Sequence, residues 1–170
     1  MGNVKVIMCI VFLLQGFLFE VNAADINVNG QVVASPCIID IATENQTVDF
    51  GKLQHRDFSA TGSASEWIPI SLKLTTCPAS TSKVIANFSG SPDDDDSALY
   101  NNAGTARNIA VQLSDVTHAQ KLGMGSSLTV AVDSALRTAT VPLASRLFSV
   151  NGMSKGGSII GAVQVGVTYQ

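Results

Sequence analysis

Apolar and polar side chains alternate along most of this chain with a period of two. Residues 67–77 show it clearly, because every second position there is a large aliphatic residue: Ile68, Ile70, Leu72 and Leu74. Such alternation is typical of a β-strand with one buried face, since successive side chains of a strand point to opposite sides. Similar alternation predicts further strands in residues 24–34, 47–53, 83–90, 108–115, 127–132, 138–148 and 159–170.

Clusters of turn-forming residues separate these segments, for example SATGSASE at residues 59–66 and VNGMSKGGS at residues 150–158. Helical periodicity is not evident in any segment. Short strands joined by turns predict an all-β fold, an antiparallel β-sandwich. Pro69 and Pro142 cannot donate to a strand ladder, so each is expected at an edge or a bulge.

The alternation continues to the last residue of the chain. From residue 159 onward one face carries Ile159, Gly161, Val163, Val165, Val167 and Tyr169. No later segment follows that can pair with the far side of this strand, so an open sheet edge is expected there. An apolar edge strand is a liability for a solitary protein, because it invites pairing with another chain.

Composition and charge narrow the class of protein. The chain has 170 residues, 46% of them hydrophobic and 14% charged, with a net charge of −3. This length is sufficient for one domain with a sizeable core. Because the basic residues are scattered rather than clustered on one face, a nucleic-acid partner is not expected.

The first residues have the layout of a secretory signal peptide. Lys5 supplies a positive charge, an apolar stretch follows, and VNA at residues 21–23 offers small residues for cleavage after Ala23. A membrane anchor is the alternative, but the apolar run is short of a bilayer span and contains Gln15. We therefore expect residues 1–23 to be removed on export.

Two cysteines remain in the mature chain, Cys37 and Cys77, because Cys9 lies in the signal segment. In an exported protein two thiols most simply form one disulfide, and the alternative is two free buried thiols. In the chain-entropy model a disulfide closing a loop of this length contributes roughly 4 kcal/mol.

Several residues are candidates for a metal, catalytic or sugar-binding site. The run Asp93 to Asp96 lacks the spacing of a calcium loop and is expected to be a solvated loop tip. His55 and His118 are the only histidines, and neither lies near a motif of known catalytic mechanics. Trp67 and Phe88 begin or end alternating runs, which favours core packing over a sugar-stacking surface. No catalytic residue, metal site, cofactor or small-molecule substrate is expected.

The two ends of the mature chain have complementary features. Residues 24–34 form an apolar strand that precedes Cys37, so this segment can be free of its own domain. The last strand, in contrast, lacks a neighbour. Addition of a strand to an exposed sheet edge is an established recognition mode. The alternative is that both ends pair within one complete sandwich.

The chain resembles the chaperone–usher pilins, and most closely the minor tip (adaptor) subunits of type 1 fimbriae. The resemblance covers essentially the whole mature chain, including VNGQVVASPC (28–37), LTTCPASTSKVIANFSG (74–90), NAGTARNIAVQL (102–113) and VGVTYQ (165–170). Pilins of this family have a penultimate tyrosine and a glycine fourteenth from the end, which correspond to Tyr169 and Gly157. In one respect the chain departs from the family: counted from Ala24, the arm before Cys37 is about two residues shorter than in adaptor subunits. Either cleavage falls elsewhere, or one fewer pocket of the neighbour is filled.

The resemblance implies an incomplete immunoglobulin-like β-sandwich that lacks its final strand, residues 35–170, with Cys37 and Cys77 as its disulfide. It implies that a periplasmic chaperone, and later a neighbouring pilin, lends a strand to the groove beside the last strand. An outer-membrane usher is the further expected partner, and the Gln170 carboxylate is expected to contact basic residues of the chaperone. The groove residues are Gly157, Ile159, Val163, Val165, Val167, Tyr169 and Gln170. The donor segment 24–34 would insert Ile26, Val28, Gly30 and Val32 into another subunit.

The expected function is that of a structural subunit of a cell-surface fimbrium, reached through the periplasm, which polymerises by donor-strand exchange near the fibre tip. A fimbrial adhesin that binds a receptor or glycan is the alternative, although such adhesins have a second domain and lack a donor arm. A secreted hydrolase is a weaker third hypothesis, because no reaction is suggested by the residues.

Overall fold

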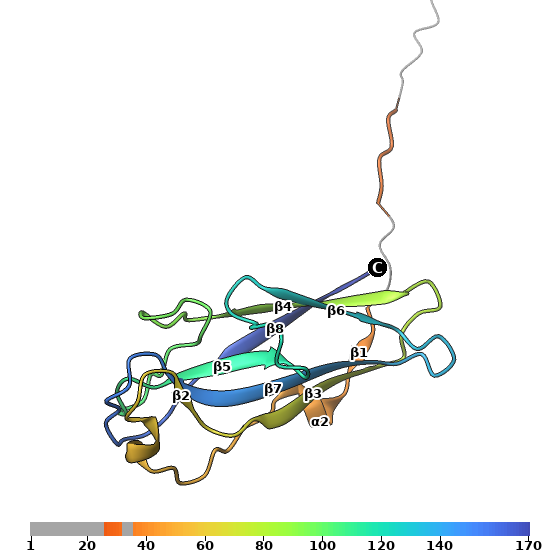
Figure 1. Cartoon of the computed structure of the whole chain (residues 1–170). Helices are drawn as coiled ribbons and strands as arrows, with labels where there is room; N and C mark the ends of the chain where they lie inside the picture. Colours follow the sequence, from red (N-terminus) through yellow and green to blue (C-terminus); the bar gives the residue numbers. More distant parts are fainter. Residues whose placement is uncertain (1–25, 32–35) are drawn as a thin grey trace, which may run out of the picture. The chain divides into compact units, whose positions relative to one another are not determined.

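The structure is a computed structural model that describes residues 26–31 and 36–170 (Figure 1). The predicted signal segment 1–23 and Val32 lie outside the described residues. The chain divides into two units, residues 1–32 and residues 33–170, and each is described by itself. In the first unit, residues 26–31 have no regular secondary structure, and every one of them is exposed to solvent.

Residues 36–170 form two antiparallel sheets, which confirms the predicted all-β class. The strands within this range are β1 (Ile38–Ile39), β2 (Ser63–Ala64), β3 (Ile68–Thr75), β4 (Lys83–Gly90), β5 (Ala110–Asp115), β6 (Ser127–Ala131), β7 (Ala139–Ser149) and β8 (Val163–Tyr169). Two single helical turns, which periodicity did not predict, are α2 (Ile41–Glu44) and η2 (His55–Phe58). Asp40 begins α2, since its carboxylate accepts a hydrogen bond from the Ala42 amide at 2.9 Å.

The larger sheet is organised around β7. One side of β7 pairs with β3, where Leu72 is opposite Val141, and also with the short β2. The other side pairs with β5, where Leu113 is opposite Ser145. The smaller sheet has the order β6-β4-β8, so β8 is at its edge within the described part of the chain. Figure 1 shows β4, β6 and β8 lying across β3, β5 and β7 as a second layer.

The core fills the space between the two sheets. The predicted alternation of β3 and β4 is confirmed, because their apolar faces are buried while the intervening residues are mostly exposed. The larger sheet contributes Leu72, Leu74, Leu113, Val141, Leu143 and Leu147, and the smaller sheet contributes Val84, Ala86 and Phe88. Phe88 is 2% exposed, as predicted for a core aromatic.

Both strand prolines occupy positions that have a strand neighbour on one side only. Pro69 is opposite Ala144, and β1 reaches β3 only at its far end, beside Leu74 and Thr75. Pro142 is opposite Ser71, just beyond the last residue that β5 pairs with β7. The missing amide hydrogens therefore leave no ladder bond unmade, which is the condition that the sequence predicted.

Three segments depart from the predicted strands. Residues 47–53 form no strand, and the final strand begins at Val163 rather than at Ile159. The described residues 26–31 of the N-terminal segment are not in a strand either. A strand needs a hydrogen-bonded neighbour, and within the described residues neither 47–53 nor 26–31 has one. Residues 158–160 are hydrogen-bonded instead to the loop at residues 102–106.

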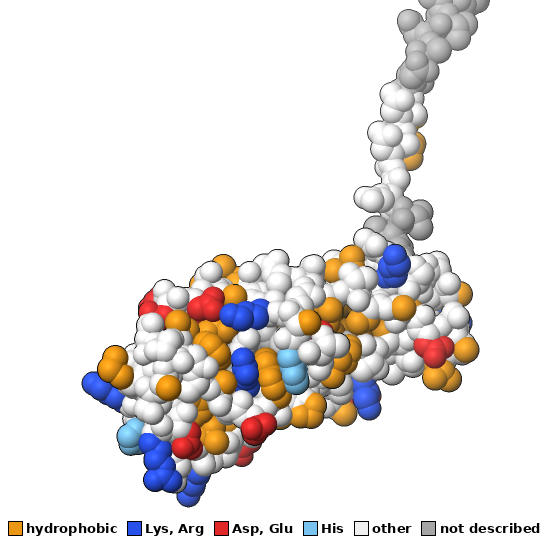
Figure 2. Space-filling model, viewed as in Figure 1, with side chains coloured by type: hydrophobic (Ala, Val, Ile, Leu, Met, Phe, Trp, Pro, Cys, Tyr) orange, Lys and Arg blue, Asp and Glu red, His pale blue; other side chains and the backbone are white. Residues whose placement is uncertain are grey.

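The prediction that Trp67 packs in the core is wrong. Trp67 is half-buried, lies outside the core cluster and stacks on His118 with the ring centroids 4.3 Å apart. Figure 2 shows hydrophobic side chains next to those of Lys, Arg and His on one face of the domain. Trp67 lies just before β3, outside the strand, so the alternation of the strand does not fix the direction of its side chain.

Candidate strand-acceptor groove

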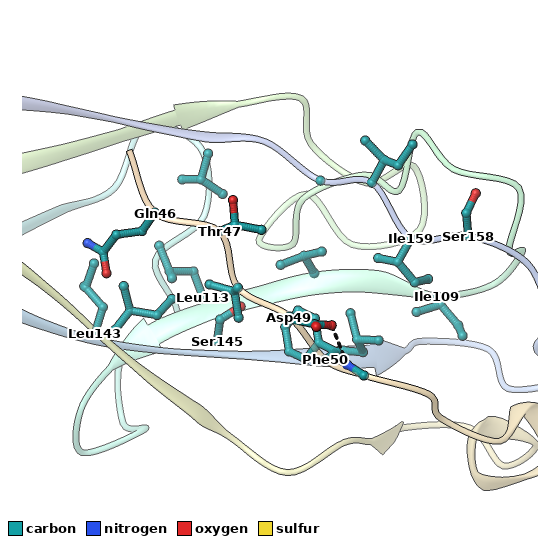
Figure 3. Close-up of a pocket in the computed structure, with 18 of the residues that line it drawn as sticks. Gln46, Thr47, Asp49, Phe50, Ile109, Leu113, Leu143, Ser145, Ser158 and Ile159 are labelled. Carbon is teal, nitrogen blue, oxygen red and sulfur yellow. Dashed lines mark hydrogen bonds between the residues drawn. The ribbon is translucent and has the colours of Figure 1, made fainter. Parts of the chain in front are cut away.

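A long groove of about 1000 Å³ opens between two stretches of chain that are distant in sequence (Figure 3). Residues 43–53 form one wall, and residues 155–165 form the other. Figure 3 shows Gln46 to Phe50 on the first wall and Ser158 and Ile159 on the second. The floor between them is largely aliphatic and comes from the larger sheet: Ile70, Leu72, Val111, Leu113, Leu143 and Leu147.

The first wall has an unpaired backbone. Between Thr47 and Leu53 no main-chain amide or carbonyl is hydrogen-bonded to another main-chain group of the described residues. The turn is fixed locally, because the Asp49 carboxylate accepts a hydrogen bond from the Gly51 amide at 2.8 Å. Gln46 anchors the start of the wall by donating its side-chain amide to the Ser71 carbonyl at 2.9 Å. The wall is thus anchored at its start, while most of its main chain remains free to pair.

The second wall leads into β8, whose outer edge is open. β8 pairs with β4 from Val163 opposite Gly90 to Tyr169 opposite Val84, and no other strand of the described residues contacts its far side. The four side chains that β8 turns toward the core are only half-buried, whereas those of the neighbouring β4 are 0–2% exposed. Because the core-facing side chains of β8 are only half-buried, no strand covers the core at this edge of the described domain.

Asn102 joins the second wall to the body of the domain. Its side chain is 7% exposed, and its oxygen accepts hydrogen bonds from the amides of Gly104 and Ile160, both at 2.8 Å. Its amide group donates to the Ala106 carbonyl at 3.1 Å. Main-chain bonds from Ala103 to Ile160 and from Ala106 to Ser158 complete the contact. This loop contact explains why no strand forms before Val163.

Gly157 lies where this wall passes closest to the loop at residues 105 and 106. A Cβ at Gly157 would stand 2.3 Å from the Ala106 nitrogen and 2.5 Å from the Thr105 carbonyl carbon. Both are main-chain atoms, so no side-chain rotation can relieve the collision. Glycine is therefore required here by close approach of two backbones.

The end of β8 is tied to the disulfide. Cys37 and Cys77 are bonded, which confirms the predicted pair, and the Tyr169 hydroxyl donates to the Cys37 carbonyl at 3.3 Å. Burial raises the pKa of Tyr169 above its ordinary value, so the phenol keeps its proton to a higher pH than an exposed tyrosine does. The main-chain oxygen of Gln170 accepts bonds from the amides of Ser82 at 2.6 Å and Lys83 at 2.9 Å.

The predicted groove residues lie along one continuous wall. Gly157, Ile159, Val163 and Val165 line the groove, and Val167, Tyr169 and Gln170 continue along β8. Their role in binding a strand stays a prediction. Of the predicted donor residues, Ile26 is 86% and Val28 87% exposed, a Cβ added at Gly30 would meet nothing within 4 Å, and Val32 is outside the described residues.

Sequence reasoning missed the opposite wall and the Asn102 contact. Residues 47–53 were predicted as a strand, and their apolar Phe50 was the available signal for a groove wall. For Asn102, the nearby Gly104 was a signal of a turn closed by an asparagine side chain. The long-range bond to Ile160 has no local signal in the sequence.

No helix of the described residues is long and apolar enough to span a bilayer. Within residues 26–31 and 36–170, no three His, Cys, Asp or Glu side chains are arranged to hold a metal ion. The sequence expectation for Asp93 to Asp96 was a loop tip, and there Asp96 forms an ion pair with Lys121 at 3.1 Å.

A two-sheet sandwich with an open edge beside an unpaired wall defines the class of incomplete immunoglobulin-like domains. The family model described as Fimbrial protein matches residues 26–170, and the chain belongs to this family.

Individual relatives agree with this assignment. Protein FimG of Escherichia coli K12 is 41% identical over 151 residues, covering 88% of this chain and 87% of that protein. The uncharacterized fimbrial-like protein YdeR of the same strain is 43% identical over 156 residues, covering 91% and 90%. Among solved structures, the P pilus rod subunit PapA superposes with a TM-score of 0.67 at 18% identity, covering 80% of this chain and 100% of PapA.

The chain is therefore a chaperone–usher pilin, a structural subunit of a fimbrium and not an enzyme. Its immunoglobulin-like fold lacks the last strand, as the sequence resemblance implied. A pilin contacts neighbouring pilin subunits, and the fimbrium to which it belongs lies on the cell surface.

Proposed function

We propose that this subunit links two neighbours in a fimbrium by donor-strand exchange. It would accept a strand from one neighbour in the groove between residues 43–53 and β8, and donate residues 24–34 to the other. The observation that carries the proposal is an apolar groove with an unpaired main chain on one wall and the open edge of β8 on the other, in a chain that also has an exposed aliphatic arm.

The energetics favour a bound strand. Residues Val163, Val165 and Val167 are half-buried, so an inserted strand would remove additional apolar surface from water. Three aliphatic side chains entering the groove contribute roughly 5–8 kcal/mol from transfer alone. Ordering the arm offsets part of this gain, and main-chain pairing with β8 adds to it.

The residue roles follow from position. Gly157, Ile159, Val163, Val165, Val167 and Tyr169 would form the accepting wall, with Gln170 at its end. In the arm, the side chains of Ile26, Val28 and Val32 would fill a neighbour's groove, and Gly30 would allow close approach of the two backbones. The domain organisation would be a signal peptide 1–23, a donor arm 24–34 and a pilin domain 35–170.

A periplasmic chaperone would occupy the same groove before assembly, and an outer-membrane usher would receive the complex. Both belong to the proposal because an open apolar edge needs cover during export. Basic chaperone residues would contact Gln170, which lies at the end of β8 beside Ser82 and Lys83. A position near the fibre tip is supported by the resemblance to adaptor subunits.

The test is a chain of residues 24–170 extended after Gln170 by a flexible linker and a second copy of residues 24–34. The matched control has Ile26, Val28 and Val32 of that second copy replaced by Asn. We expect the melting temperature of the extended chain to exceed that of the control by about 10 °C or more. Hydrogen exchange should show new protection along residues 163–169.

Because an arm can be selective for a particular groove, a donor-arm peptide from a related fimbrial subunit is run alongside. Protection of β8 by either strand supports the proposal. If neither strand raises the melting temperature nor protects β8, the sandwich does not accept a strand and the proposal is wrong.

A further inference from the structure

A stack of aromatic and cationic side chains lies on the outer face of the larger sheet. Trp67 is stacked on His118 at 4.3 Å with the rings 7° from parallel, and the Arg146 guanidinium lies 4.4 Å from the Trp67 ring centroid. The same guanidinium is 5.3 Å from the Phe148 ring, and the Lys121 ammonium is 5.9 Å from that ring. We call these five residues the cationic stack.

The cationic stack is remote from the groove. In β7, Leu143 and Leu147 line the groove, and the side chains of a strand alternate, so Arg146 and Phe148 point to the opposite face. Figure 2 shows blue, pale blue and orange side chains close together on the face presented there, which Figure 1 places over β5 and β7.

Arg146 is fixed in place. Its Nε donates to the side-chain oxygen of Gln112 at 2.8 Å, and Gln112 is 4% exposed. The guanidinium also lies 4.4 Å from the Trp67 ring centroid and 5.3 Å from the Phe148 ring centroid. An arginine held at its Nε and packed against two aromatic rings offers its two Nη groups in a preset orientation, and these make no hydrogen bond with the described residues.

The positive charge of Arg146 is not balanced by a protein carboxylate. The ion pairs of the described residues are Arg56 with Asp57 and Lys121 with Asp96. Burial lowers the pKa of Arg146, which means that its charge is partly stripped of water without a compensating partner. An anion that reached the Nη groups would make a charge-assisted, bidentate contact.

The nearest loop does not supply that anion. Asp115 lies in the segment that leads to His118, but its carboxylate accepts hydrogen bonds from Thr117 and Gln120. These bonds, that of the Thr117 hydroxyl first, lower the pKa of Asp115 to about 2. The carboxylate of Asp115 is thus committed to its own turn.

We propose that the cationic stack is a binding site for a carboxylated sugar, such as a sialic or uronic acid. The carboxylate would bind the Nη groups of Arg146, and Lys121, whose charge is already paired with Asp96, would border the site. The apolar C–H face of the sugar ring would pack on the exposed ring of His118 or the edge of Trp67. A sugar acid combines a rigid carboxylate with an apolar face, whereas an Asp or Glu side chain offers the carboxylate alone.

Trp67 is the only tryptophan of the chain, so its fluorescence reports on this site directly. The chain of residues 24–170 is titrated with N-acetylneuraminic acid and with glucuronic acid at low ionic strength, and with N-acetylglucosamine and glucose as neutral controls. We expect a saturable change with the acids and none with the neutral sugars. Added salt should weaken the binding.

Variants assign the contact. Arg146→Gln should weaken binding at least tenfold. Arg146→Lys should weaken it to a lesser extent, because lysine keeps the positive charge but lacks the planar guanidinium that binds a carboxylate through two parallel hydrogen bonds. Lys73→Gln removes one exposed positive charge elsewhere and should bind as the parent does. Thermal unfolding identifies any variant that fails to fold, and His118→Ala then serves as the second variant, with binding expected to fall severalfold.

The proposal is wrong if Trp67 fluorescence shows no saturable change up to the solubility limit of the acids, or if acidic and neutral sugars change it equally. Unchanged binding by Arg146→Gln would overturn it as well. A peptide of consecutive glutamates that bound more tightly than either sugar acid would assign the site to a protein partner and would also overturn it. Since the groove is on the other face of the larger sheet, this test and the strand-addition test can fail independently.

Discussion

At the scale of single residues, Tyr100 shows how one buried polar group is accommodated. Its side chain is fully buried, and its hydroxyl donates to the Leu122 carbonyl at 2.9 Å. Its main chain exchanges two hydrogen bonds with Val111 of β5, at 2.8 and 2.9 Å. Burial raises the pKa of Tyr100 to about 12 from an ordinary value of 10.0, because the phenolate would be deprived of water.

This shift predicts loss of stability in alkali. The unfolded tyrosine ionises near pH 10, whereas the folded one holds its proton to about pH 12, so the stabilisation is complete below pH 10 and is lost as the pH rises toward 12. The total is roughly 2–3 kcal/mol for a shift of about two units. Urea unfolding between pH 9 and pH 11 should show the decline.

Tyr100→Phe is the matched variant. It should be less stable at neutral pH by about 1 kcal/mol, because the Leu122 carbonyl loses its donor, and its stability should fall less steeply in alkali. Some slope should remain, because burial also raises the pKa of Tyr169, the other tyrosine of the chain. Identical alkaline slopes for parent and variant would contradict the assignment.

The aromatic residues also show what sequence reasoning can achieve for side chains. Phe88 was predicted in the core because it continues the alternation of a strand, and it is buried there. Trp67 was predicted wrongly, since it precedes β3 and its neighbours His118 and Arg146 are distant in sequence. The direction of a side chain outside regular structure depends on tertiary contacts, which local periodicity does not record.

At the scale of elements, the wall at residues 156–161 is positioned by close packing against residues 102–106. Gly157 and Gly156 offer a direct comparison, because an added Cβ collides with main-chain atoms at the first and has nothing within 4 Å at the second. This contrast between adjacent glycines allows a test of whether the close approach holds the groove wall.

We expect Gly157→Ala to lower the free energy of unfolding by about 1–3 kcal/mol, because the wall or the loop must shift. Gly156→Ala, at an open position, should change it by less than about 0.5 kcal/mol. Urea denaturation measures both. Equal effects of the two substitutions would show that the approach at Gly157 is not a constraint.

The strands β3, β4, β5, β6 and β7 were predicted within one or two residues, because each has a hydrogen-bonded partner strand in the same domain. Residues 47–53 alternate as a strand would, yet form none. Residues 158–160 are held by Asn102 and the neighbouring loop instead of by a strand. The predictions failed at the two groove walls, where the alternating segments have no pairing strand among the described residues.

At the scale of the whole molecule, the disulfide joins the start of the domain to the residues just after β3. Cys37 and Cys77 are 40 residues apart in sequence, and both side chains are in the core. The Tyr169 hydroxyl adds the end of β8 to the same point by bonding the Cys37 carbonyl. Three remote parts of the chain therefore meet at Cys37.

Replacement of both cysteines by alanine should lower the free energy of unfolding by roughly 4 kcal/mol, the value that the chain-entropy model gives for a 40-residue loop. Chemical denaturation of the double variant against the oxidised parent measures the loss. The parent treated with a reductant is the control and should approach the variant. An unchanged midpoint would mean that the loop is already constrained in the unfolded chain.

The meeting of these parts at Cys37 bears on how a fibre carries mechanical load. If residues 24–34 are anchored in a neighbour, a pull along the fibre enters this subunit where the arm joins the domain. There the disulfide leads to the end of β3, and the Tyr169 hydroxyl leads to β8, the strand that would lie beside a bound donor. In the proposed assembly, tension would therefore enter the domain at a point that is covalently joined to β3 and hydrogen-bonded to β8.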